Sequence, residues 1–482
     1  MKRVVTCSLA ALSLAACAPD TSPLAPDAAL GRNGDPSLSV GAGAIAIVTH
    51  TYDNGKGSFR DAIAQANADP RIRRIEFKPA NTTVRLTTPV VYTGAQALTI
   101  VGKDATIDAT DAGGSAVVAT GGANLAIEHL TVRNAAAQGI EIQIPTTATG
   151  TIAVTLDHVT VSDNKGHGVL INDQEETATT DGVQPNANGS AAALDVTITN
   201  SRFTGNGFSV SDRDGVRINE GGAGSLTFRA SNVQAEDNAA DGIELDERGT
   251  GDVIIDVRDT RIARNGQFDP EDLDDGFDID EYNDGSIIGA LIRTDAVDNY
   301  EEGLDFNENN AGDLRVDLFQ VTASGNGEEG IDYEEDDDFA GGGDLVTAMV
   351  DIVANGNGGD GGLKIREKGT GDLTATVTRV TANDNLVSGI AIREDAAGTL
   401  ASTISDAQTT GNAAHGIDFD ENSTGDLVAN VSQLISMGNT LYGVRADQQT
   451  TGTGALHLTT ATLTGNGGGT TTGSNVVLTI LP

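Results

Sequence analysis

The sequence predicts an all-β fold, a right-handed parallel β-helix (solenoid) with a short N-terminal capping helix. One recurring motif carries this prediction: a glycine, two apolar residues at alternate positions, and then an acid. It reads GIELDE at 242–247, GLDFNE at 303–308 and GIDFDE at 416–421. A unit that recurs at a fixed period is typical of solenoids, whose coils bury their apolar faces only against neighbouring coils.

The spacing of the motif gives the length of one coil. Successive final acids are separated by 27, 34, 27, 27, 32, 27 and 27 residues, so the period returns to 27 after each insertion. These acids are Glu220, Glu247, Glu281, Glu308, Glu335, Glu367, Glu394 and Glu421. Apolar residues at every second position indicate strands rather than helices. Short strands in a coil of this length predict a parallel β-helix.

A column of asparagines accompanies the motif. Most of its glycines have an asparagine four residues earlier, namely Asn238, Asn299, Asn326, Asn385, Asn412 and Asn439. Asparagine tolerates unusual turn dihedrals, and its amide can bond to the same amide one coil away. We therefore expect a stack of asparagine amides along the turn before the motif.

The combined pattern, Asn-x-x-x-Gly-Ile-x-apolar, resembles the repeat of the pectin-lyase-like superfamily of parallel β-helices over roughly residues 85–480. The resemblance implies the fold. Because the superfamily includes lyases, hydrolases, adhesins and inert stalks, it leaves the activity open.

The N-terminal segments indicate export. Residues 1–16 have the basic start and apolar run of a signal peptide, and LAAC at 14–17 resembles a bacterial lipobox. This implies a lipidated Cys17 at the start of a flexible tether, residues 17–40; a plain secretory signal is the alternative. Ala18 after the cysteine resembles outer-membrane lipoproteins of Gram-negative bacteria. We expect an extracytoplasmic protein at the outer membrane or cell surface that contacts the membrane only through its lipid.

Residues 41–84 are predicted to cap the solenoid, which then occupies residues 85–482. The cap contains GSFRDAIAQAN at 57–67, which resembles the entry segment of many secreted bacterial β-helices. Ser58 is placed to cap a helix and Asp61 to complete a capping box. Phe59, Ala62, Ile63 and Ala66 share one face, which would cover the open end of the core.

Composition restricts the partners. A formal net charge of −41 disfavours nucleic acid and anionic membranes, which would be repelled. We expect a monomer whose partner is an extracellular polysaccharide or another cell-surface molecule. Aromatic residues make up only 4% of the chain and tryptophan is absent, which weakens any function that depends on stacking sugar rings.

Acidic residues concentrate in the middle coils. Residues 265–344 hold 26 acids against two basic residues, Arg293 and Arg315. Coils stack about 4.8 Å apart, so each like-charged pair costs roughly 0.9 kcal/mol even in bulk water. Raised pKa values, salt or bound divalent cations would relieve this repulsion, and carboxylates suit Ca²⁺. We predict Ca²⁺ sites among Asp278, Asp280, Glu281, Asp305, Glu308, Asp332 and Glu335; a solvated acidic face that aids solubility is the alternative.

Basic residues interrupt the acidic columns at Lys364, Arg366 and Arg393. Resemblance to superfamily lyases implies that Arg366 or Arg393 could act as a base beside calcium-binding acids, with β-elimination of a uronate polymer. Neutralisation of the neighbouring acids is the alternative role. Asp278 with Asp280, or Asp305 with Asp332, could also supply the paired carboxylates of an inverting glycoside hydrolase.

The histidines form no predicted site. His129 and His158 share a strand column, whereas His167 and His415 each precede a turn glycine, and exposed structural positions explain them. The sequence therefore predicts a lipid-anchored surface protein with an acidic, calcium-binding face that acts in adhesion or polysaccharide recognition. A polysaccharide lyase or hydrolase is the alternative, and the sequence leaves open whether the protein is an enzyme.

Overall fold

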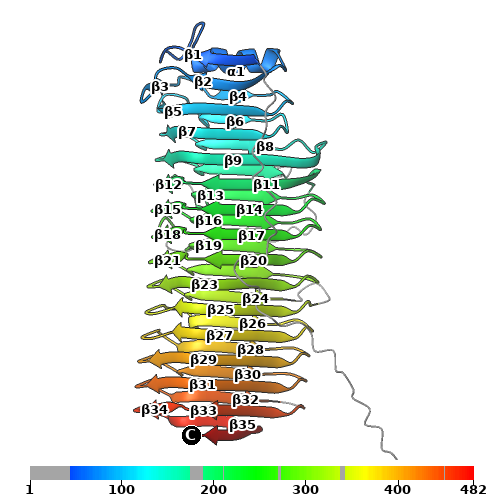
Figure 1. The fold of residues 1–482 in the computed structure, drawn as a ribbon, viewed down its shortest axis with the longest axis vertical. Coiled ribbons are helices and arrows are strands. Elements are labelled where there is room, and N and C mark those ends of the chain that lie inside the picture. The colour runs from blue at the N-terminus through cyan, green and yellow to red at the C-terminus, as the bar shows by residue number, and fades with distance from the viewer. Residues whose placement is uncertain (1–43, 174–187, 210, 270–272, 337–341, 450) are drawn as a thin grey trace, which may run out of the picture. The chain divides into compact units, whose positions relative to one another are not determined.

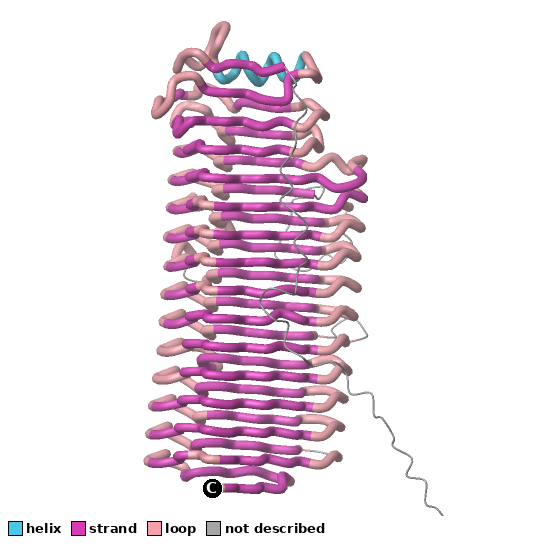
Figure 2. Tube along the Cα trace, in the orientation of Figure 1, coloured by secondary structure: helices cyan, strands magenta, loops and turns pink. Residues whose placement is uncertain are grey.

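The computed structural model describes residues 44–173, 188–209, 211–269, 273–336, 342–449 and 451–482. The predicted signal peptide, Cys17 and the tether lie outside the described residues. Within the described ranges the chain winds into a stack of coils made of two parallel sheets, as Figures 1 and 2 show. The predicted parallel β-solenoid is confirmed.

The 14-stranded sheet takes one strand from each coil in chain order, and most of its strands follow the motif glycine. Its strands are β4 (Val90–Tyr92), β6 (Val117–Ala119), β8 (Ile140–Gln143), β10 (Val169–Asp173), β13 (Val216–Glu220), β16 (Ile243–Glu247), β19 (Phe277–Glu281), β22 (Leu304–Glu308), β24 (Ile331–Glu335), β26 (Gly361–Glu367), β28 (Ser388–Glu394), β30 (Ile417–Glu421), β32 (Tyr442–Gln448) and β35 (Gly469–Ser474).

The 22-stranded sheet takes a longer, bent stretch from each coil, which is either one strand or two consecutive ones. Its strands are β1 (Ala44–Val48), β2 (Ile72–Phe77), β3 (Thr83–Arg85), β5 (Leu98–Asp108), β7 (Leu125–Arg133), β9 (Thr149–Ser162), β11 (Ala191–Thr199), β12 (Arg202–Thr204), β14 (Leu226–Ser231), β15 (Gln234–Glu236), β17 (Val253–Arg258), β18 (Arg261–Ala263), β20 (Ile287–Ile292), β21 (Asp295–Val297), β23 (Leu314–Ser324), β25 (Leu345–Val353), β27 (Leu373–Thr381), β29 (Leu400–Thr410), β31 (Leu427–Met437), β33 (Gly454–Thr459), β34 (Thr462–Thr464) and β36 (Val476–Leu481).

A left-handed residue marks the bend in the 22-stranded sheet, coil after coil. These positions, which we call the bend column, are His129, His158, Asn200, Asn232, Asp259, Arg293, Gln320, Asp351, Arg379, Asp406, Gln433 and Thr460, with φ between 50° and 60°. Asparagine and aspartate tolerate this conformation better than other non-glycine residues. The bend lets one continuous stretch cover two sides of the core.

The asparagine stack is confirmed, and it is longer than predicted. Each buried side-chain amide donates to the Oδ1 of the next asparagine at 2.9–3.2 Å, and that Oδ1 also accepts the backbone N–H. The asparagine ladder comprises Asn164, Asn206, Asn238, Asn265, Asn299, Asn326, Asn357, Asn385, Asn412, Asn439 and Asn466. These shared bonds satisfy polar groups inside the turn, which fixes the entry into each motif strand.

The predicted capping helix is α1 (Phe59–Ala68). Ser58 Oγ accepts the Asp61 N–H at 3.0 Å, and the Asp61 carboxylate accepts the Gly57 N–H at 2.7 Å. The helix buries Phe59, Ala62, Ile63 and Ala66, the face expected from the sequence. It therefore covers apolar core at the N-terminal end of the stack. None of the helices among the described residues has the length and apolar character needed to span a membrane.

Candidate cation site on the 14-stranded sheet

The predicted aspartates meet on one side of the 14-stranded sheet. Asp278 of β19 is the register partner of Asp305 of β22, which in turn partners Asp332 of β24. Phe277 and Ile279, on either side of Asp278, point into the core with no exposed surface. Strand alternation therefore directs all three aspartates away from the core.

A further column of acids lies beside them, and sequence reasoning missed it. Each of these residues directly precedes the motif glycine: Asp214, Asp241, Asp275, Glu302 and Glu329. Asp241 Oδ1 accepts the Asp275 N–H at 2.5 Å, and Asp275 Oδ1 accepts the Glu302 N–H at 2.7 Å. Repetition of an acid just before the glycine is the signal that could have revealed this column.

We call the combined surface the acidic face. It comprises Asp241, Glu244, Asp246, Asp275, Asp278, Asp280, Glu302, Asp305, Glu329, Asp332 and Glu334. Within it, Asp275, Asp278 and Asp305 each offer a carboxylate oxygen, and these oxygens all lie within 4.8 Å of one another. Asp241, Glu244 and Asp278 form a second such group, so Asp278 belongs to both. Both groups could hold a metal ion.

Basic residues neutralise the two ends of the acidic face but not its centre. Arg217 forms ion pairs with Glu244 and with Asp246, the latter at 2.9 Å. At the other end, Lys364 Nζ lies 2.7 Å from Asp332 Oδ2 and from Glu334 Oε1.

Asp275, Asp278 and Asp305 form no ion pair with any described residue. Three carboxylates at ligand distance thus lack a positive counter-charge at the centre of the face.

Several oxygens of the acidic face also lack hydrogen-bond donors. Oδ1 of Asp278, of Asp305 and of Asp332 is buried, and no described residue donates a hydrogen bond to it. Asp332 as a whole is only 4% exposed. A buried carboxylate oxygen without a donor or cation is costly, so these atoms favour a bound ion or a proton at the site.

The carboxyl pKa values reflect the same crowding. Burial raises the pKa of Asp278 and of Asp305 well above the usual range, and neighbouring aspartates raise them further. Burial raises the pKa of Asp280 to about 6, with Asp246 adding to it. It also raises the pKa of Glu302 to about 8, with Glu301 and Glu329 among the other causes. In the absence of a cation, protons would carry the counter-charge.

The predicted glutamate ligands lie elsewhere. Glu281, Glu308 and Glu335 are register partners with no exposed surface. They stand on the same side of their strands as the core residues, because they are an even number of positions from them. Strand alternation thus separates them from Asp278, Asp305 and Asp332.

The glutamates belong to a longer buried column, which we call the glutamate column: Glu220, Glu247, Glu281, Glu308, Glu335, Glu367, Glu394 and Glu421. Each one accepts a backbone N–H from the turn that follows its strand; Glu247 Oε1, for example, accepts the Gly249 N–H at 3.0 Å. The column therefore holds the turns in shape.

The predicted catalytic arginines are held in ion pairs. Arg366 lies 2.5 Å from Asp395 and 3.6 Å from Glu334, and Arg393 lies 2.7 Å from Asp360. Burial lowers the pKa of Arg366, but its bonds to Asp395 and the charge of Glu334 outweigh this and raise the pKa above its usual value. That direction opposes the loss of a proton that a catalytic base requires.

The histidines divide into two kinds. His129 and His158 are exposed, as expected, with 43% and 50% of their side-chain surface accessible. His167 and His415 are buried, contrary to expectation, at 3% and 8% exposure. Both lie directly before a motif glycine, in the same column as Asp214 and Asp241, where neighbouring coils cover the side chain. His167 Nδ1, for example, accepts the Asp214 N–H at 3.0 Å.

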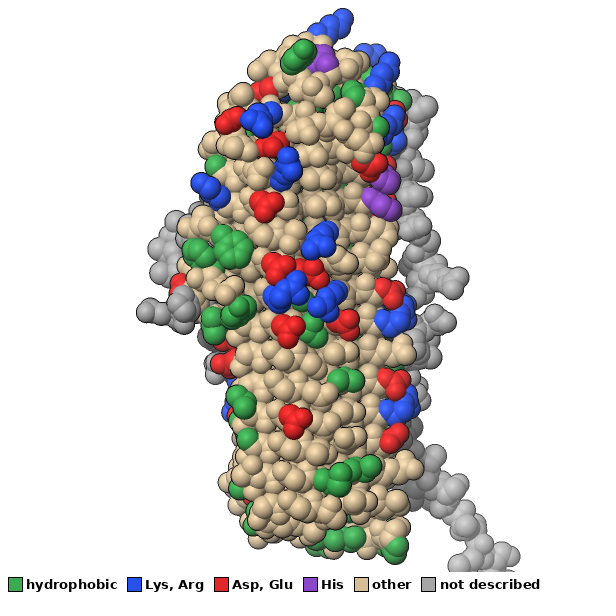
Figure 3. All heavy atoms as spheres, turned by 90° about the vertical axis from the view of Figure 1, so that its left-hand side faces the viewer, with side chains coloured by type: hydrophobic (Ala, Val, Ile, Leu, Met, Phe, Trp, Pro, Cys, Tyr) green, Lys and Arg blue, Asp and Glu red, His purple; other side chains and the backbone are tan. Residues whose placement is uncertain are grey.

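A cavity of about 340 Å³ opens on another side of the coils, beside β15, β18 and β21. It is lined by Phe208, Asp237, Arg264, Gln267, Asp298 and Tyr300. Phe208 and Tyr300 are 49% and 36% exposed, and Phe268 packs edge-on against Phe208 with ring centroids 6.1 Å apart. Figure 3, which views the solenoid from this side, shows hydrophobic side chains next to a group of basic and acidic ones.

The chain is a parallel β-solenoid. It is similar to the solved structure of pectate lyase Pel9A, at 17% identity over 64% of this chain and 77% of that one, with a TM-score of 0.43. It is also similar to the A-module of the Azotobacter vinelandii mannuronan C-5 epimerase AlgE6, at 10% identity over 88% and 94% of the two chains, with a TM-score of 0.39. The periplasmic alginate epimerase AlgG is 12% identical over 88% of each chain, with a TM-score of 0.35. No protein-family model and no curated protein sequence matches the chain.

Proposed function

We propose that this protein is a calcium-binding β-solenoid that binds acidic polysaccharide outside the cytoplasm, anchored by a lipid on Cys17. The group formed by Asp275, Asp278 and Asp305 carries the proposal, because these carboxylates converge without a basic partner among the described residues. The polysaccharide and the lipid anchor are inferences built on that site and on the N-terminal sequence.

The donor set fits Ca²⁺. Every candidate ligand is a carboxylate oxygen, and oxygen-only sets in flexible arrangements suit Ca²⁺ better than metals that prefer nitrogen or sulfur. The unpartnered Oδ1 atoms of Asp278 and Asp305 supply free lone pairs at the same place. Asp275, Asp278 and Asp305 would hold the ion, which would neutralise the centre of the acidic face.

A thermal-unfolding titration tests the calcium site. After full chelation, Ca²⁺ at a hundredfold its Kd stabilises by about 2.7 kcal/mol, so we expect Tm to rise by several degrees. In chelator, Asp278→Asn and Asp305→Asn should each raise Tm, because a neutral amide removes the cost of placing another carboxyl group in this crowded, buried cluster. In both variants, Ca²⁺ should produce only a small part of the rise in Tm that it produces in the wild type.

The exposed Asp111 provides the matched control, since Asp111→Asn removes one charge away from the acidic face. This variant should keep the wild-type response to Ca²⁺. A Tm unaffected by Ca²⁺, or an equal loss of response in Asp111→Asn, would contradict the calcium site.

Calcium also provides a route to an acidic polymer. A chain with a net charge of −41 repels a polyuronate. A Ca²⁺ ion held by the acidic face could coordinate a uronate carboxylate with its remaining positions. The cavity beside Phe208 and Tyr300 offers exposed aromatic rings and the Arg264 guanidinium for a sugar unit.

Affinity electrophoresis through gels containing polygalacturonate or alginate tests this step. We expect retardation in Ca²⁺ that disappears in chelator and in Asp278→Asn, whereas a neutral glucan gel should not retard the protein. Equal mobility in all gels, with an intact thermal response to Ca²⁺, would reject the polysaccharide and leave the metal site standing.

An enzymatic alternative rests on the raised pKa values. Burial raises the pKa of Asp332 to about 7, which would keep a carboxylic acid available near neutral pH, with Asp305 as its neighbour in the preceding coil. Release of reducing ends or unsaturated uronates from a polysaccharide panel would support an enzyme. Two variants would then separate the two activities: Asp332→Asn should abolish that of a hydrolase, and Arg366→Ala that of a lyase.

A further inference from the structure

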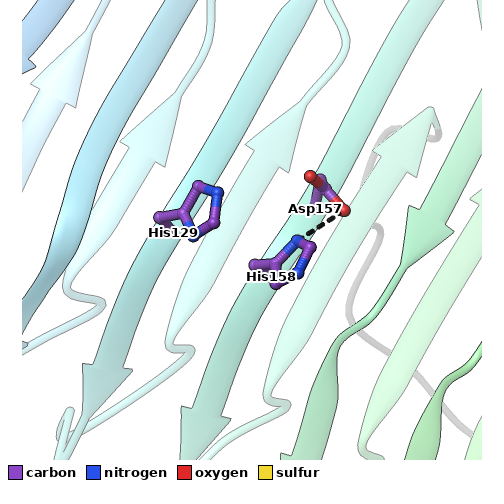
Figure 4. Close-up of side chains that lie close together, drawn as sticks. All are labelled: His129, Asp157 and His158. Atoms are coloured by element: carbon purple, nitrogen blue, oxygen red, sulfur yellow. Dashed lines mark ion pairs between the residues drawn. The ribbon is translucent and has the colours of Figure 1, made fainter.

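The first two positions of the bend column carry histidines that face each other across neighbouring coils. His129 and His158 have φ of 51° and 52°, and the residues that flank them are register partners. Their rings stack with centroids 4.5 Å apart and planes 20° apart. Figure 4 shows the two side chains on neighbouring strands, with Asp157 next to His158. Two imidazoles are therefore held side by side on an accessible edge of the solenoid.

Carboxylates complete this group. His158 Nδ1 lies 3.0 Å from Asp157 Oδ1, and His129 Nδ1 lies 3.4 Å from Asp104 Oδ1. Asp157 is fixed by Thr199 and Asn200 of the next coil, which donate to its Oδ1 at 2.7 and 2.9 Å. Glu128, the register partner of Asp157, adds another negative charge to the same strip.

The spacing of these donors matches a metal site. One ring nitrogen of each histidine and one oxygen of Asp157 all lie within 4.8 Å of one another. Metal–ligand bonds of about 2.0–2.2 Å place the ligands roughly 3.3 Å apart, so closure needs shifts of about 1 Å. Half-exposed side chains can make such shifts by rotation about χ1 and χ2.

We propose that His129, His158 and Asp157 bind a divalent transition-metal ion of the Zn²⁺ type. Two imidazoles with one carboxylate form a donor set for Zn²⁺, Ni²⁺ or Cu²⁺ and not for Ca²⁺, which takes oxygen. The site lies on the 22-stranded sheet, away from the acidic face on the other sheet. It is therefore independent of the proposed calcium site.

Calorimetric titration of the untagged full chain with Zn²⁺, in saturating Ca²⁺, tests the proposal. We expect one Zn²⁺ per chain with a micromolar Kd, and at least a thirtyfold weaker Kd in His129→Asn and in His158→Asn. Asparagine is the matched replacement because Asn200 and Asn232 occupy the same bend column with positive φ. The control His457→Asn, at an exposed histidine of β33, should bind like the wild type.

A second measurement needs no variant. Zn²⁺ should protect His129 and His158 of the wild-type protein from modification by diethylpyrocarbonate, whereas exposed His457 should react equally with and without the metal. The proposal would be overturned if Zn²⁺ did not bind at one site, or if both histidine variants bound it like the wild type. It would also be overturned if Zn²⁺ left the modification of His129 and His158 unchanged, as it should for His457.

Discussion

Glu308 is the register partner of Glu281 in the preceding coil, and neither side chain has any exposed surface. Stacked carboxyl groups this close cannot all be ionised without a large electrostatic cost. Burial, together with the hydrogen bond and the charge from Glu281, raises the pKa of Glu308 to about 10. The glutamate column is thus built to share protons between neighbouring carboxyl groups.

The column predicts that stability falls as pH rises. Burial raises the pKa of Glu367 and of Glu421 to about 7, and that of Glu394 to about 9, above the ordinary value of 4.5. The folded state then binds more protons than the unfolded state, so the free energy of unfolding decreases from about pH 4.5 up to these folded pKa values. Thermal unfolding in chelator should show Tm decreasing between pH 5 and pH 9 by several degrees.

A glutamine tests whether the column causes this dependence. Glu394→Gln should raise Tm by about 2 °C at pH 8 and flatten the pH profile. The native chain already ends the column with a buried glutamine, Gln448, the register partner of Glu421. A profile as steep in Glu394→Gln as in the wild type would count against proton sharing.

The repeat of the motif is sufficient to predict the fold. Prediction of the site also requires knowing which side of the sheet each side chain faces. The period of the motif predicts the register of Asp278 with Asp305 and Asp332, which the structure has. The prediction also includes Glu281, which adjoins Asp280 in the sequence, whereas strand alternation turns its side chain to the core side of the sheet.

The remaining features depend on contacts between coils. The burial of Asp332 and the ion pair of Arg393 with Asp360 come from residues more than twenty positions away. The stacking of His129 on His158 requires the bend in the 22-stranded sheet, which no residue type in the sequence marks uniformly.

The asparagine ladder predicts a large loss of stability on truncation. Asn326→Ala removes the bond from its amide to Asn357 Oδ1 at 3.2 Å, and it removes the Oδ1 that accepts from both the side-chain amide and the backbone N–H of Asn299. Because these groups are buried, the expected loss is about 3 kcal/mol. Denaturant unfolding measures it, with Asn54→Ala at an exposed turn as the control. Equal stability of the two variants would show that the ladder contributes little.

The bend column predicts a stabilising substitution. Gln320 is exposed with φ of 58°, and it makes no hydrogen bond with its side chain among the described contacts. Gln320→Asn should stabilise by roughly 0.5 kcal/mol, whereas Gln320→Val should destabilise by about 1–2 kcal/mol, because a β-branched residue is strained there. The order of the three midpoints in denaturant checks the argument, and a valine variant as stable as the asparagine variant would refute it.

Removal of the Lys364 charge should lengthen the part of the acidic face that lacks a basic partner. Its Nζ lies within 3.7 Å of Glu329, Asp332 and Glu334, so it supplies counter-charge to one end of that face. Lys364→Met removes the charge, and the expected cost in chelator at pH 8 is about 3 kcal/mol, because buried carboxylates lose their partner. Ca²⁺ should restore more stability to this variant than it adds to the wild type, because one more coil then needs a cation.

Arg315→Met, which removes an exposed charge paired with Asp313, provides the control and should change neither value. Denaturant midpoints with and without Ca²⁺ measure both effects, and a variant that Ca²⁺ fails to rescue would separate the role of Lys364 from the cation site.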